Sequence, residues 1–343
     1  MKYNFLGNTG LLVSELCFGT MTFGGRGRWM AIGQQPQEEA NALLKICVEA
    51  GINFFDTANA YSEGLSEEML GQGIRDLGLD RHDLVIATKA RIRMAPGVNR
   101  VGLSRVHLMQ EVEASLRRMN TDFIDLYQIH GVDAHTPLEE TLRALEDIVR
   151  SGKVRYVGCC NLPAWQVMKA LGIAERRGWD KMVSCQHYYS LASRDIEREL
   201  VPMLQDQQLA LLPWSPLAGG LLSGKFTREN QSPEDARRTN FDFPIVDKER
   251  AFDCIEVMAE IAKAHQVSVA QIALTWQLHQ PFVTSVIIGA KTQAQLVDNL
   301  GSVSVKLSDE ELERLQHVSQ LPPEYPGWMV NFQSRDRLPE NQN

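Results

Sequence analysis

The chain has 343 residues, of which 44% are hydrophobic and 23% are charged, a composition typical of a globular protein with a substantial core. The formal net charge of −8 argues against nucleic acid or an anionic membrane as the main partner, because both repel a negatively charged protein. The N-terminus lacks the apolar core of a signal peptide, and no apolar run approaches the roughly 18 residues of a membrane span. We therefore expect a cytoplasmic protein.

Most of the chain alternates between two kinds of segment. Residues 1–13 predict a short hairpin around Gly7–Gly10 that caps the bottom of a barrel. Eight β-rich runs follow, at 14–20, 52–56, 84–89, 123–130, 154–160, 182–188, 210–215 and 285–290. Segments with helical period separate most of them, at 38–50, 66–77, 104–119, 137–150, 163–177 and 193–207, and Ser66 is the predicted cap of the second. Strands that alternate with helices pair in parallel, and eight such units predict an α/β fold, a (β/α)₈ TIM barrel.

The second half contains additions to this repeat. Residues 216–249 form a long stretch rich in glycine, proline and charge, and long loops in compact domains are usually functional. Two extra helices are expected at 250–265 and 268–280, before the last strand. The tail, 321–343, is predicted to be irregular, with disorder at its end. No linker divides the sequence, so we expect residues 1–343 to form one domain, and no feature specifies an oligomeric state.

Six cysteines lie in apolar segments without CxxC spacing. This pattern favours buried, reduced thiols, as in a cytosolic protein. Cys159 and Cys160 are adjacent, but neighbours on a strand point to opposite faces, which argues against a redox pair.

Polar residues lie at or just beyond the ends of the predicted strands, where the active sites of such barrels are found. The most informative are Asp56, Tyr61, Lys89 and His130. The same rule selects residues at the ends of the other strands, namely Thr20, Met21, Cys160, Asn161, Gln186, Trp214, Ser215 and the segment 289–291.

The first four residues predict acid–base chemistry. Free tyrosine has a pKa of about 10, and an ammonium nearby lowers it. Lys89 can supply that charge if Asp56 compensates for its burial. Tyr61 would then act as a general acid toward a developing alkoxide, with His130 as a second hydrogen-bond donor. This arrangement suits carbonyl reduction by hydride transfer from a cofactor.

Each of these residues also has an ordinary structural explanation when taken alone. Asp56 could cap a helix, Lys89 could extend its ammonium to solvent, and His130 could be a hydrogen-bonded structural histidine. A metal site formed by His130, Asp56 and His187 is disfavoured because the lysine beside the carboxylate repels a cation. We expect no metal.

Several motifs, in this order, resemble those of the aldo-keto reductases, in the bacterial and plant branch that also contains the potassium-channel β-subunits. They are FLGNTGLLVSELCFGTMTFGG (5–25), DTANAYSEGLSE (56–67), ATK (87–89), DLYQIH (125–130), GKVRYVGCCNLP (152–163), PWSPLAGGLLSGKF (213–226) and IIGAKTQAQLVDNL (287–300). The match covers nearly the whole chain. It implies that Asp56, Tyr61, Lys89 and His130 form the catalytic tetrad, with Tyr61 as the acid/base.

The resemblance also implies a nicotinamide cofactor. Asn161 and Gln186 match residues that bind the carboxamide, and Trp214 matches the aromatic residue that stacks on the ring. The pyrophosphate loop would comprise Ser215, Pro216, Leu217, Gly219, Leu221 and Lys225. The adenosine end would contact Ile288, Gly289, Lys291, Gln295 and Asn299. Gly19, Thr20, Met21, Asp56 and Cys160 complete the predicted cofactor site.

Lys291 is placed to contact a 2′-phosphate, so NADPH is favoured over NADH, although a solvated lysine at a helix start is the alternative. Two departures from the family pattern bear on the cofactor. Cys160 stands where serine or threonine is usual, and its thiol is a weaker donor. Gln295 stands where many NADP-preferring members carry arginine, which predicts only modest discrimination against NADH.

The expected function is NADPH-dependent reduction of a small carbonyl substrate, an aldehyde in the first place and a ketone in the second. Phe23 and Trp29 are predicted pocket walls, next to Tyr61 and His130. The alternative is a nucleotide-sensing regulatory subunit similar to the channel β-subunits.

Overall fold

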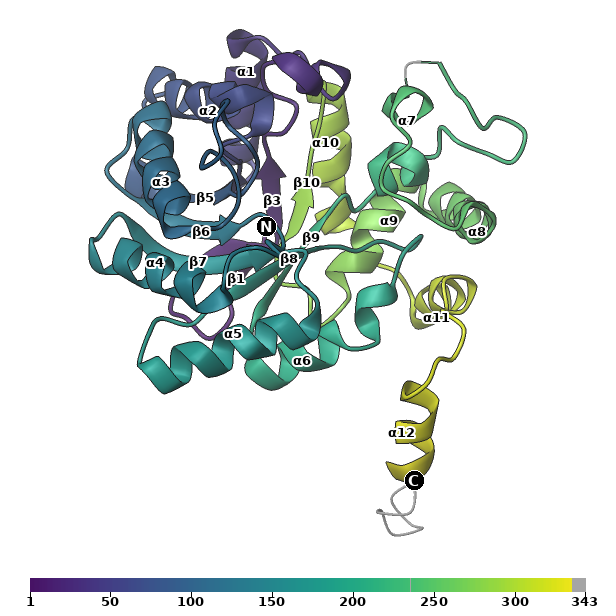
Figure 1. Cartoon of the computed structure of the whole chain (residues 1–343). Helices are drawn as coiled ribbons and strands as arrows, with labels where there is room; N and C mark the ends of the chain where they lie inside the picture. Colours follow the sequence, from purple (N-terminus) through teal and green to yellow (C-terminus); the bar gives the residue numbers. More distant parts are fainter. Residues whose placement is uncertain (235, 335–343) are drawn as a thin grey trace.

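Eight parallel strands form the centre of the molecule (Figure 1). The computed structural model describes residues 1–234 and 236–334. The strands pair in the order β10-β3-β4-β5-β6-β7-β8-β9, and an isolated parallel bridge between Leu211 and Val283 links the two ends of this series. Their bounds are β3 Leu16–Gly19, β4 Phe54–Asp56, β5 Val85–Ala90, β6 Ile124–Ile129, β7 Val154–Cys160, β8 Ser184–Tyr188, β9 Ala210–Trp214 and β10 Val286–Ile288. This confirms the predicted (β/α)₈ barrel.

Helices surround the strands. They are α1 Gln37–Glu49, α2 Leu65–Asp76, α3 Arg105–Met119, α4 Leu138–Arg150, α5 Ala164–Arg177, α6 Leu200–Gln207, α9 Val269–Leu278 and α10 Gln293–Gly301. The helix predicted over 193–207 is instead a short 3₁₀ turn followed by α6. The predicted Ser66 cap is wrong, because α2 starts one residue earlier, after Gly64 in a left-handed conformation. The Ser66 hydroxyl donates to the Thr20 carbonyl oxygen at 2.8 Å, so it joins α2 to the end of β3.

The N-terminal hairpin closes one end of the barrel. Strands β1 (Tyr3–Phe5) and β2 (Leu12–Ser14) pair antiparallel. Leu6 and Val13 are completely buried and belong to one cluster with the inward-facing Phe54, Leu126 and Leu212. A β-carbon on Gly7 would lie 2.4 Å from the Val183 carbonyl oxygen, at the start of β8. The hairpin therefore seals the end of the barrel opposite to the strand carboxyl termini, as the sequence predicts.

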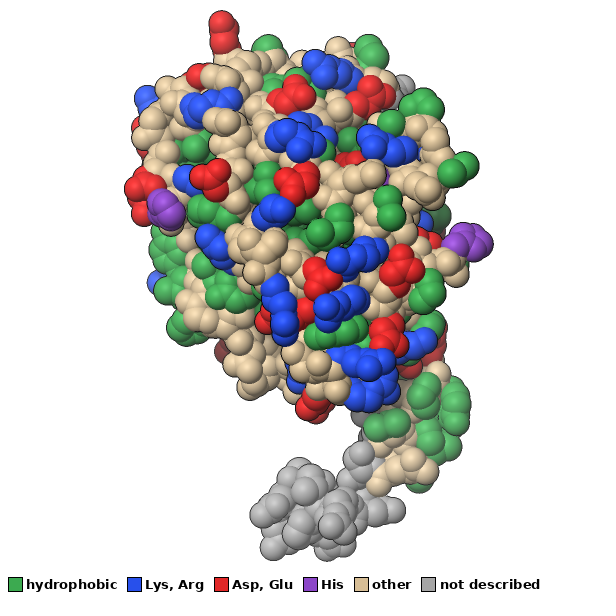
Figure 2. All heavy atoms as spheres, turned by 60° about the vertical axis from the view of Figure 1, so that its left-hand side comes forward, with side chains coloured by type: hydrophobic (Ala, Val, Ile, Leu, Met, Phe, Trp, Pro, Cys, Tyr) green, Lys and Arg blue, Asp and Glu red, His purple; other side chains and the backbone are tan. Residues whose placement is uncertain are grey.

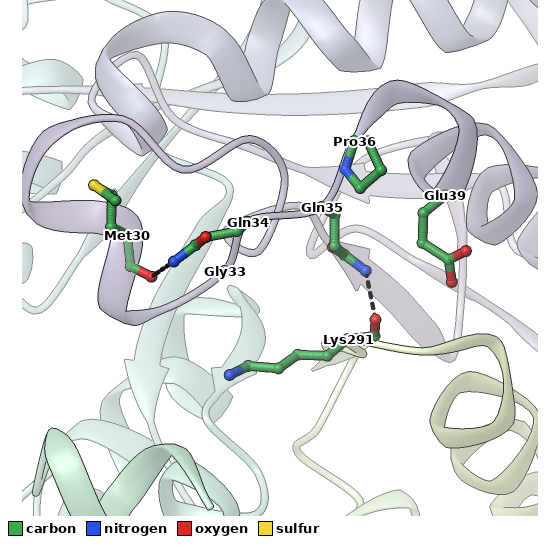
Figure 3. Close-up of a pocket in the computed structure, with 7 residues that line it drawn as sticks. All are labelled: Met30, Gly33, Gln34, Gln35, Pro36, Glu39 and Lys291. Carbon is green, nitrogen blue, oxygen red and sulfur yellow. Dashed lines mark hydrogen bonds between the residues drawn. The ribbon is translucent and has the colours of Figure 1, made fainter. Parts of the chain in front are cut away.

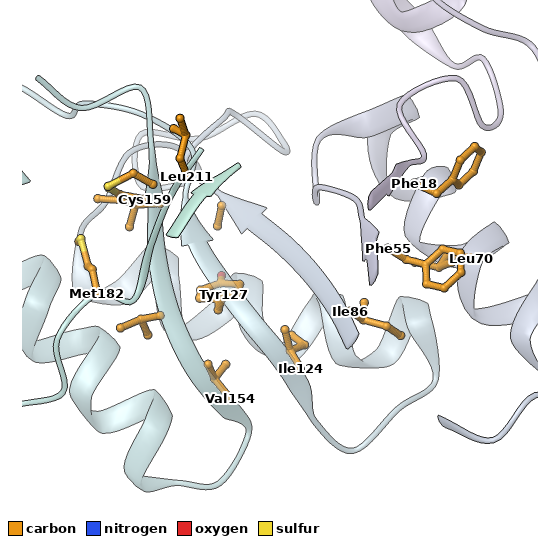
Figure 4. Packing of buried hydrophobic residues seen from close by; sticks show 14 of the residues in the cluster. Phe18, Phe55, Leu70, Ile86, Ile124, Tyr127, Val154, Cys159, Met182 and Leu211 are labelled. Atoms are coloured by element: carbon orange, nitrogen blue, oxygen red, sulfur yellow. The ribbon is translucent and has the colours of Figure 1, made fainter. Parts of the chain in front are cut away.

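Strand alternation separates two sets of buried residues. Ile86 and Tyr127 face outward and belong to the large apolar layer between strands and helices (Figure 4). Val85, Ala87 and Leu126 belong to the interior cluster. Because side chains alternate along a strand, the positions two residues after these inward residues also point into the barrel. On β5 the next inward position is Lys89, so the interior is apolar below and polar at the carboxyl ends.

Further elements lie beside the barrel in the second half of the chain. They are α7 Arg237–Asn240, α8 Lys248–His265, α11 Asp309–Val318 and α12 Gly327–Ser334. A second apolar cluster joins α8, α9 and α11. The tail predicted to be irregular contains α12, which projects from the barrel (Figure 1) and carries exposed apolar side chains such as Trp328 and Phe332. Residues 335–343 of that tail lie outside the described residues.

The surface turned forward in Figure 2 carries interspersed positive and negative side chains, so the net negative charge is not gathered in one patch there. All six cysteines are free and buried, as expected, and the sulfur atoms of Cys159 and Cys185 lie 3.4 Å apart on neighbouring strands. Within residues 1–234 and 236–334, no helix has both the length and the apolar character needed to traverse a bilayer.

Candidate active site

A buried ion pair with a phenol beside it lies at the carboxyl ends of β4 and β5. The Lys89 ammonium donates to Asp56 Oδ2 at 2.5 Å, to the Thr57 carbonyl oxygen at 2.8 Å and to the Tyr61 hydroxyl at 3.4 Å. The relative exposures are 0% for Lys89, 3% for Asp56 and 8% for Tyr61. The structure thus brings three residues of the predicted tetrad into direct contact, in a place from which most water is excluded.

An unusual turn presents Tyr61 to this pair. The turn, Tyr61–Gly64, contains three successive residues of positive φ, at 48° for Ser62, 57° for Glu63 and 96° for Gly64. Such conformations are costly for residues other than glycine and persist only where surrounding contacts hold them. One such contact is the hydrogen bond of 2.8 Å from the Ser62 hydroxyl to the Phe23 carbonyl oxygen.

Two rings flank Tyr61. His130 follows β6, and its ring lies edge-on to Tyr61 at a centroid distance of 5.9 Å. Trp29 contacts Tyr61 edge-on at 5.1 Å. Phe23, by contrast, is completely buried and packs against Phe18, and its contact with a substrate stays a prediction. Its carbonyl, bound by the turn that carries Tyr61, is its contribution to the site.

The protonation states differ in one respect from the sequence expectation. Burial raises the pKa of Tyr61 to about 12 and outweighs the lowering effect of Lys89. The predicted net decrease of the phenol pKa is therefore wrong. Burial lowers the pKa of Lys89, but the charge of Asp56, joined at high pH by the Tyr61 phenolate, outweighs it, and the net pKa is raised. Near neutral pH the site thus holds a cationic lysine beside a protonated phenol.

Two glutamines fix the other oxygen of the aspartate. Gln186 and Gln128 donate their side-chain amides to Asp56 Oδ1, at 2.9 and 3.4 Å. Gln186 was predicted to bind a carboxamide, and Gln128 was not predicted at all, although its inward position two residues before His130 is visible in the alternation of β6. Cys160 lies 3.8 Å from Gln128 Oε1, and burial raises the pKa of its thiol.

Residues at the carboxyl ends of β7 and β9 contact one another and a ring from a later loop. The Trp214 indole donates to Asn161 Oδ1 at 2.9 Å. Phe243 stacks on Trp214 with a centroid distance of 5.8 Å and an interplanar angle of 11°. Phe243 comes from the long loop 216–249, which offered no periodic signal. The structure therefore brings two predicted residues together and adds a third.

The loop after β9, residues 215–220, has a backbone conformation suited to holding a ligand, and we call this loop the cradle. The Ser215 hydroxyl accepts from the Gly219 amide at 2.8 Å, and φ is positive at Ser215, Ala218, Gly219 and Gly220. A β-carbon at Gly219 would lie 2.3 Å from the Phe243 carbonyl oxygen, so only glycine fits. Of the other predicted residues, Leu221 is buried, and the Pro216 carbonyl accepts from Gln277 at 3.0 Å.

Three cations gather beside this cradle. The pKa of Lys291 is lowered by its partial burial and by the charges of Arg237 and Lys225. Burial also lowers the pKa of Arg237, whose Nε is buried and has no hydrogen-bond partner among the described residues. Arg237 was not predicted, because an arginine in a charged loop carries no distinguishing pattern. Concentrated, partly desolvated positive charge of this kind suits a phosphate.

Lys291 also lines a cleft of about 380 Å³ between two loops (Figure 3). The Gln35 side chain donates to the Lys291 carbonyl oxygen at 3.0 Å. Gln295 accepts from the Lys291 amide at 2.8 Å, and Asn299 donates to the Gly289 carbonyl oxygen at 3.3 Å. The side chains predicted to contact adenosine thus hold this loop in shape.

The remaining predicted cofactor residues lie at the ends of β3 and β10 and in the loop after β9. Thr20 is completely buried and contacts the Ser66 hydroxyl at 2.8 Å. A β-carbon on Gly19 would lie 2.9 Å from the Ile287 side chain. Ile288 is buried, Met21 and Leu217 are half-buried, and Lys225 is exposed. Contact between these residues and a cofactor remains a prediction.

Known proteins share this sequence over most of its length. Residues 15–320 match the family model described as the aldo/keto reductase family. The uncharacterized oxidoreductase YrpG of Bacillus subtilis is 37% identical over 340 residues, which cover 96% of this chain and 100% of the relative. Versiconal hemiacetal acetate reductase of Aspergillus parasiticus is 34% identical over 354 residues, with 95% and 99% covered. A probable voltage-gated potassium channel subunit beta of Arabidopsis thaliana is 35% identical over 334 residues, again with 95% and 99% covered.

Proposed function

The chain belongs to the aldo/keto reductase family of oxidoreductases, which use a nicotinamide cofactor, and on that premise we propose that it reduces aldehydes to alcohols with NADPH. The observation that carries the proposal is the buried contact of Tyr61 with the Lys89–Asp56 pair. It provides an acid with its proton in place and a cation beside it, which is what reduction of a carbonyl group requires.

The roles of the residues follow from their contacts. Bound NADPH would supply the hydride. Tyr61 gives its hydroxyl proton to the carbonyl oxygen, and the Lys89 ammonium at 3.4 Å stabilises the phenolate that remains. Asp56 keeps Lys89 charged despite its burial. His130, edge-on to the phenol, is the second donor in this proposal.

The choice of NADPH is supported by the cation cluster. Lys225, Arg237 and Lys291 lie close enough for the first two to lower the pKa of the third. The buried Arg237 Nε, which has no hydrogen-bond partner within residues 1–234 and 236–334, is a donor that a phosphate oxygen would satisfy. The cradle with Ser215 and Gly219 adds the positive-φ backbone that phosphate-binding loops commonly use. These residues fit a phosphate-bearing dinucleotide.

Lys291→Ala tests the choice of cofactor. We expect the Kd for NADPH to rise by about 10- to 100-fold, the loss of one charge-assisted contact, and the Kd for NADH to change less than about twofold, because NADH lacks the 2′-phosphate. Fluorescence titration with each nucleotide measures both values. Lys306→Ala, which removes an exposed lysine outside the site, is the matched control. Equal changes for the two nucleotides would refute the phosphate contact.

The second candidate is a nucleotide-sensing regulatory subunit, favoured by the similarity to proteins named as channel β subunits. The two proposals differ in a simple assay. Loss of reduced-cofactor absorbance that depends on an added aldehyde, over a panel of aromatic and aliphatic aldehydes, supports the reductase. Nucleotide binding without turnover, together with a partner recovered from the native host, supports the regulatory subunit.

We also propose a cytoplasmic location. It is supported by the six free thiols, because cytoplasmic thiol pools keep cysteines reduced. Fractionation of the native host, with the chain followed by antibody, tests this proposal.

A further inference from the structure

A second group of buried charges lies behind the active site, between α2, α3 and β5. Arg118 donates to Glu67 Oε2 at 2.6 Å and lies 3.7 Å from Glu111 Oε2. The relative exposures are 0% for Glu67 and 2% for Glu111. His107 lies 4.0 Å from Glu111, but burial lowers its pKa. Arg118 is therefore the cation that compensates both carboxylates among the described residues near neutral pH.

Each of the two carboxylates reaches a neighbour of the catalytic residues. Glu67 accepts from the Thr88 hydroxyl at 2.6 Å, and Thr88 directly precedes Lys89. Glu111 accepts from the Asn59 amide at 2.9 Å, and Asn59 lies two residues before Tyr61. The Asn59 backbone amide also donates to the Lys89 carbonyl oxygen at 3.1 Å. The strand that carries Lys89 and the segment that carries Tyr61 thus meet at the same buried group.

Arg118 also contacts the Tyr61 turn itself. A β-carbon on Gly64, the last left-handed residue of the turn, would lie 2.7 Å from Arg118 Cδ. The aliphatic part of Arg118 therefore lies directly against the turn, while its guanidinium holds the carboxylates. Three consecutive left-handed residues need external support, and Arg118 is one of the groups that provide it.

We propose that Arg118 is a positioning residue that sets the distance between the Tyr61 phenol and the Lys89 ammonium. It acts through three routes, namely Glu67 and Thr88 to the Lys89 strand, Glu111 and Asn59 to the Tyr61 segment, and direct packing on Gly64. It contacts neither substrate nor reacting atoms. The proposal rests on the proposed reductase function for its kinetic consequence, and its structural consequence is independent of that function.

Arg118→Met tests the proposal, because methionine retains much of the aliphatic stem and removes the guanidinium. We expect kcat for aldehyde reduction to fall by about tenfold or more, with the KM for NADPH within about twofold, since only the acid is displaced. Arg118→Lys keeps a charge and should recover part of kcat. Arg117→Met, on the exposed side of the same helix, is the matched control and should retain wild-type kcat.

A double-variant cycle separates positioning from general damage. If Arg118 acts through the phenol, adding Arg118→Met to Tyr61→Phe should lower the residual kcat by less than about twofold. The same tenfold loss in both backgrounds would overturn the proposal. Asn59→Ala provides a second test if Arg118→Met does not fold. It removes the route from Glu111 to the Tyr61 segment and leaves Arg118 in contact with both carboxylates. An unchanged kcat in Asn59→Ala would also overturn the proposal.

Hydrogen exchange makes the two proposals distinguishable. In Arg118→Met, amide exchange over residues 57–66 should quicken by about tenfold or more, while exchange in β7 and β8 stays as in wild type. This readout needs no turnover. A wild-type protein that reduces no aldehyde refutes the proposed function alone. If the wild-type protein reduces aldehydes and Arg118→Met shows unchanged exchange over residues 57–66, the role of Arg118 alone is refuted.

Discussion

Tyr61→Phe is expected to lower kcat for aldehyde reduction by about 10²- to 10⁴-fold, the usual contribution of a positioned general acid. The substitution removes the hydroxyl that lies 3.4 Å from Lys89 and leaves the ring between Trp29 and His130. The phenol makes no contact with the cation cluster around Lys291, so the Kd for NADPH should stay within about twofold.

Steady-state kinetics and nucleotide titration on the same preparation measure both quantities. Tyr325→Phe, which alters an exposed tyrosine near the C-terminus, is the control and should leave kcat unchanged. Because burial raises the pKa of Tyr61 to about 12, the phenol remains a proton donor throughout the neutral and mildly alkaline range. Turnover by Tyr61→Phe close to the wild-type rate would exclude this residue as the acid.

The barrel and the positions of its polar residues were predictable from the sequence for a physical reason. Short β-branched runs separated by amphipathic segments specify parallel strands, and parallel strands bring their carboxyl ends together. Asp56 and Lys89 therefore had to meet once the barrel was assumed. Their contact at 2.5 Å follows directly from the order of the strands in the barrel.

Other properties of the site depend on quantities that the sequence does not contain. The sign of the Tyr61 pKa shift is set by the balance of burial against the charge of Lys89, and burial is known only once the loops are placed. Arg237 and Phe243 come from an irregular loop, where neither period nor capping pattern distinguishes one arginine or phenylalanine from another. The complete burial of Phe23 was not predicted for the same reason, since a glycine-rich loop gives no indication of which side chain turns inward.

Local rules were also overridden by tertiary contacts. Ser66 stands where a cap would be expected, but the chain enters α2 through Gly64, and the serine hydroxyl binds Thr20 instead. The left-handed turn that requires this entry is the one that presents Tyr61. A local rule thus fails at a functional position, which is where such failures are expected.

Asp56→Ala is expected to reduce the free energy of unfolding by about 3–5 kcal/mol at neutral pH, because it leaves a buried ammonium without its counter-ion. Lys89 is completely buried, and the Thr57 carbonyl and the Tyr61 hydroxyl that remain as acceptors carry no charge. Asp56→Ala combined with Lys89→Met should recover much of the loss, since neither charge is then buried. Urea unfolding of the three proteins measures these differences. The control is Asp147→Ala, which removes a partly buried aspartate of α4 whose ion-pair partners Arg105 and Arg143 remain in contact with solvent.

The free energy of unfolding of the Asp56→Ala protein should rise with pH, relative to wild type, in the mildly alkaline range. In wild type the folded pKa of Lys89 is raised, so the stability that the pair contributes is fully present below the unfolded lysine pKa of about 10.4 and is lost only above it. In Asp56→Ala, burial without the carboxylate lowers the folded pKa below the unfolded value. Between those two values the unfolded chain binds more protons, so stability should rise with pH relative to wild type, over about pH 7 to 9.5. A variant whose stability follows the wild-type pH curve would show that Asp56 does not hold the charge of Lys89, and the mechanism assigned to Tyr61 would lose its cation.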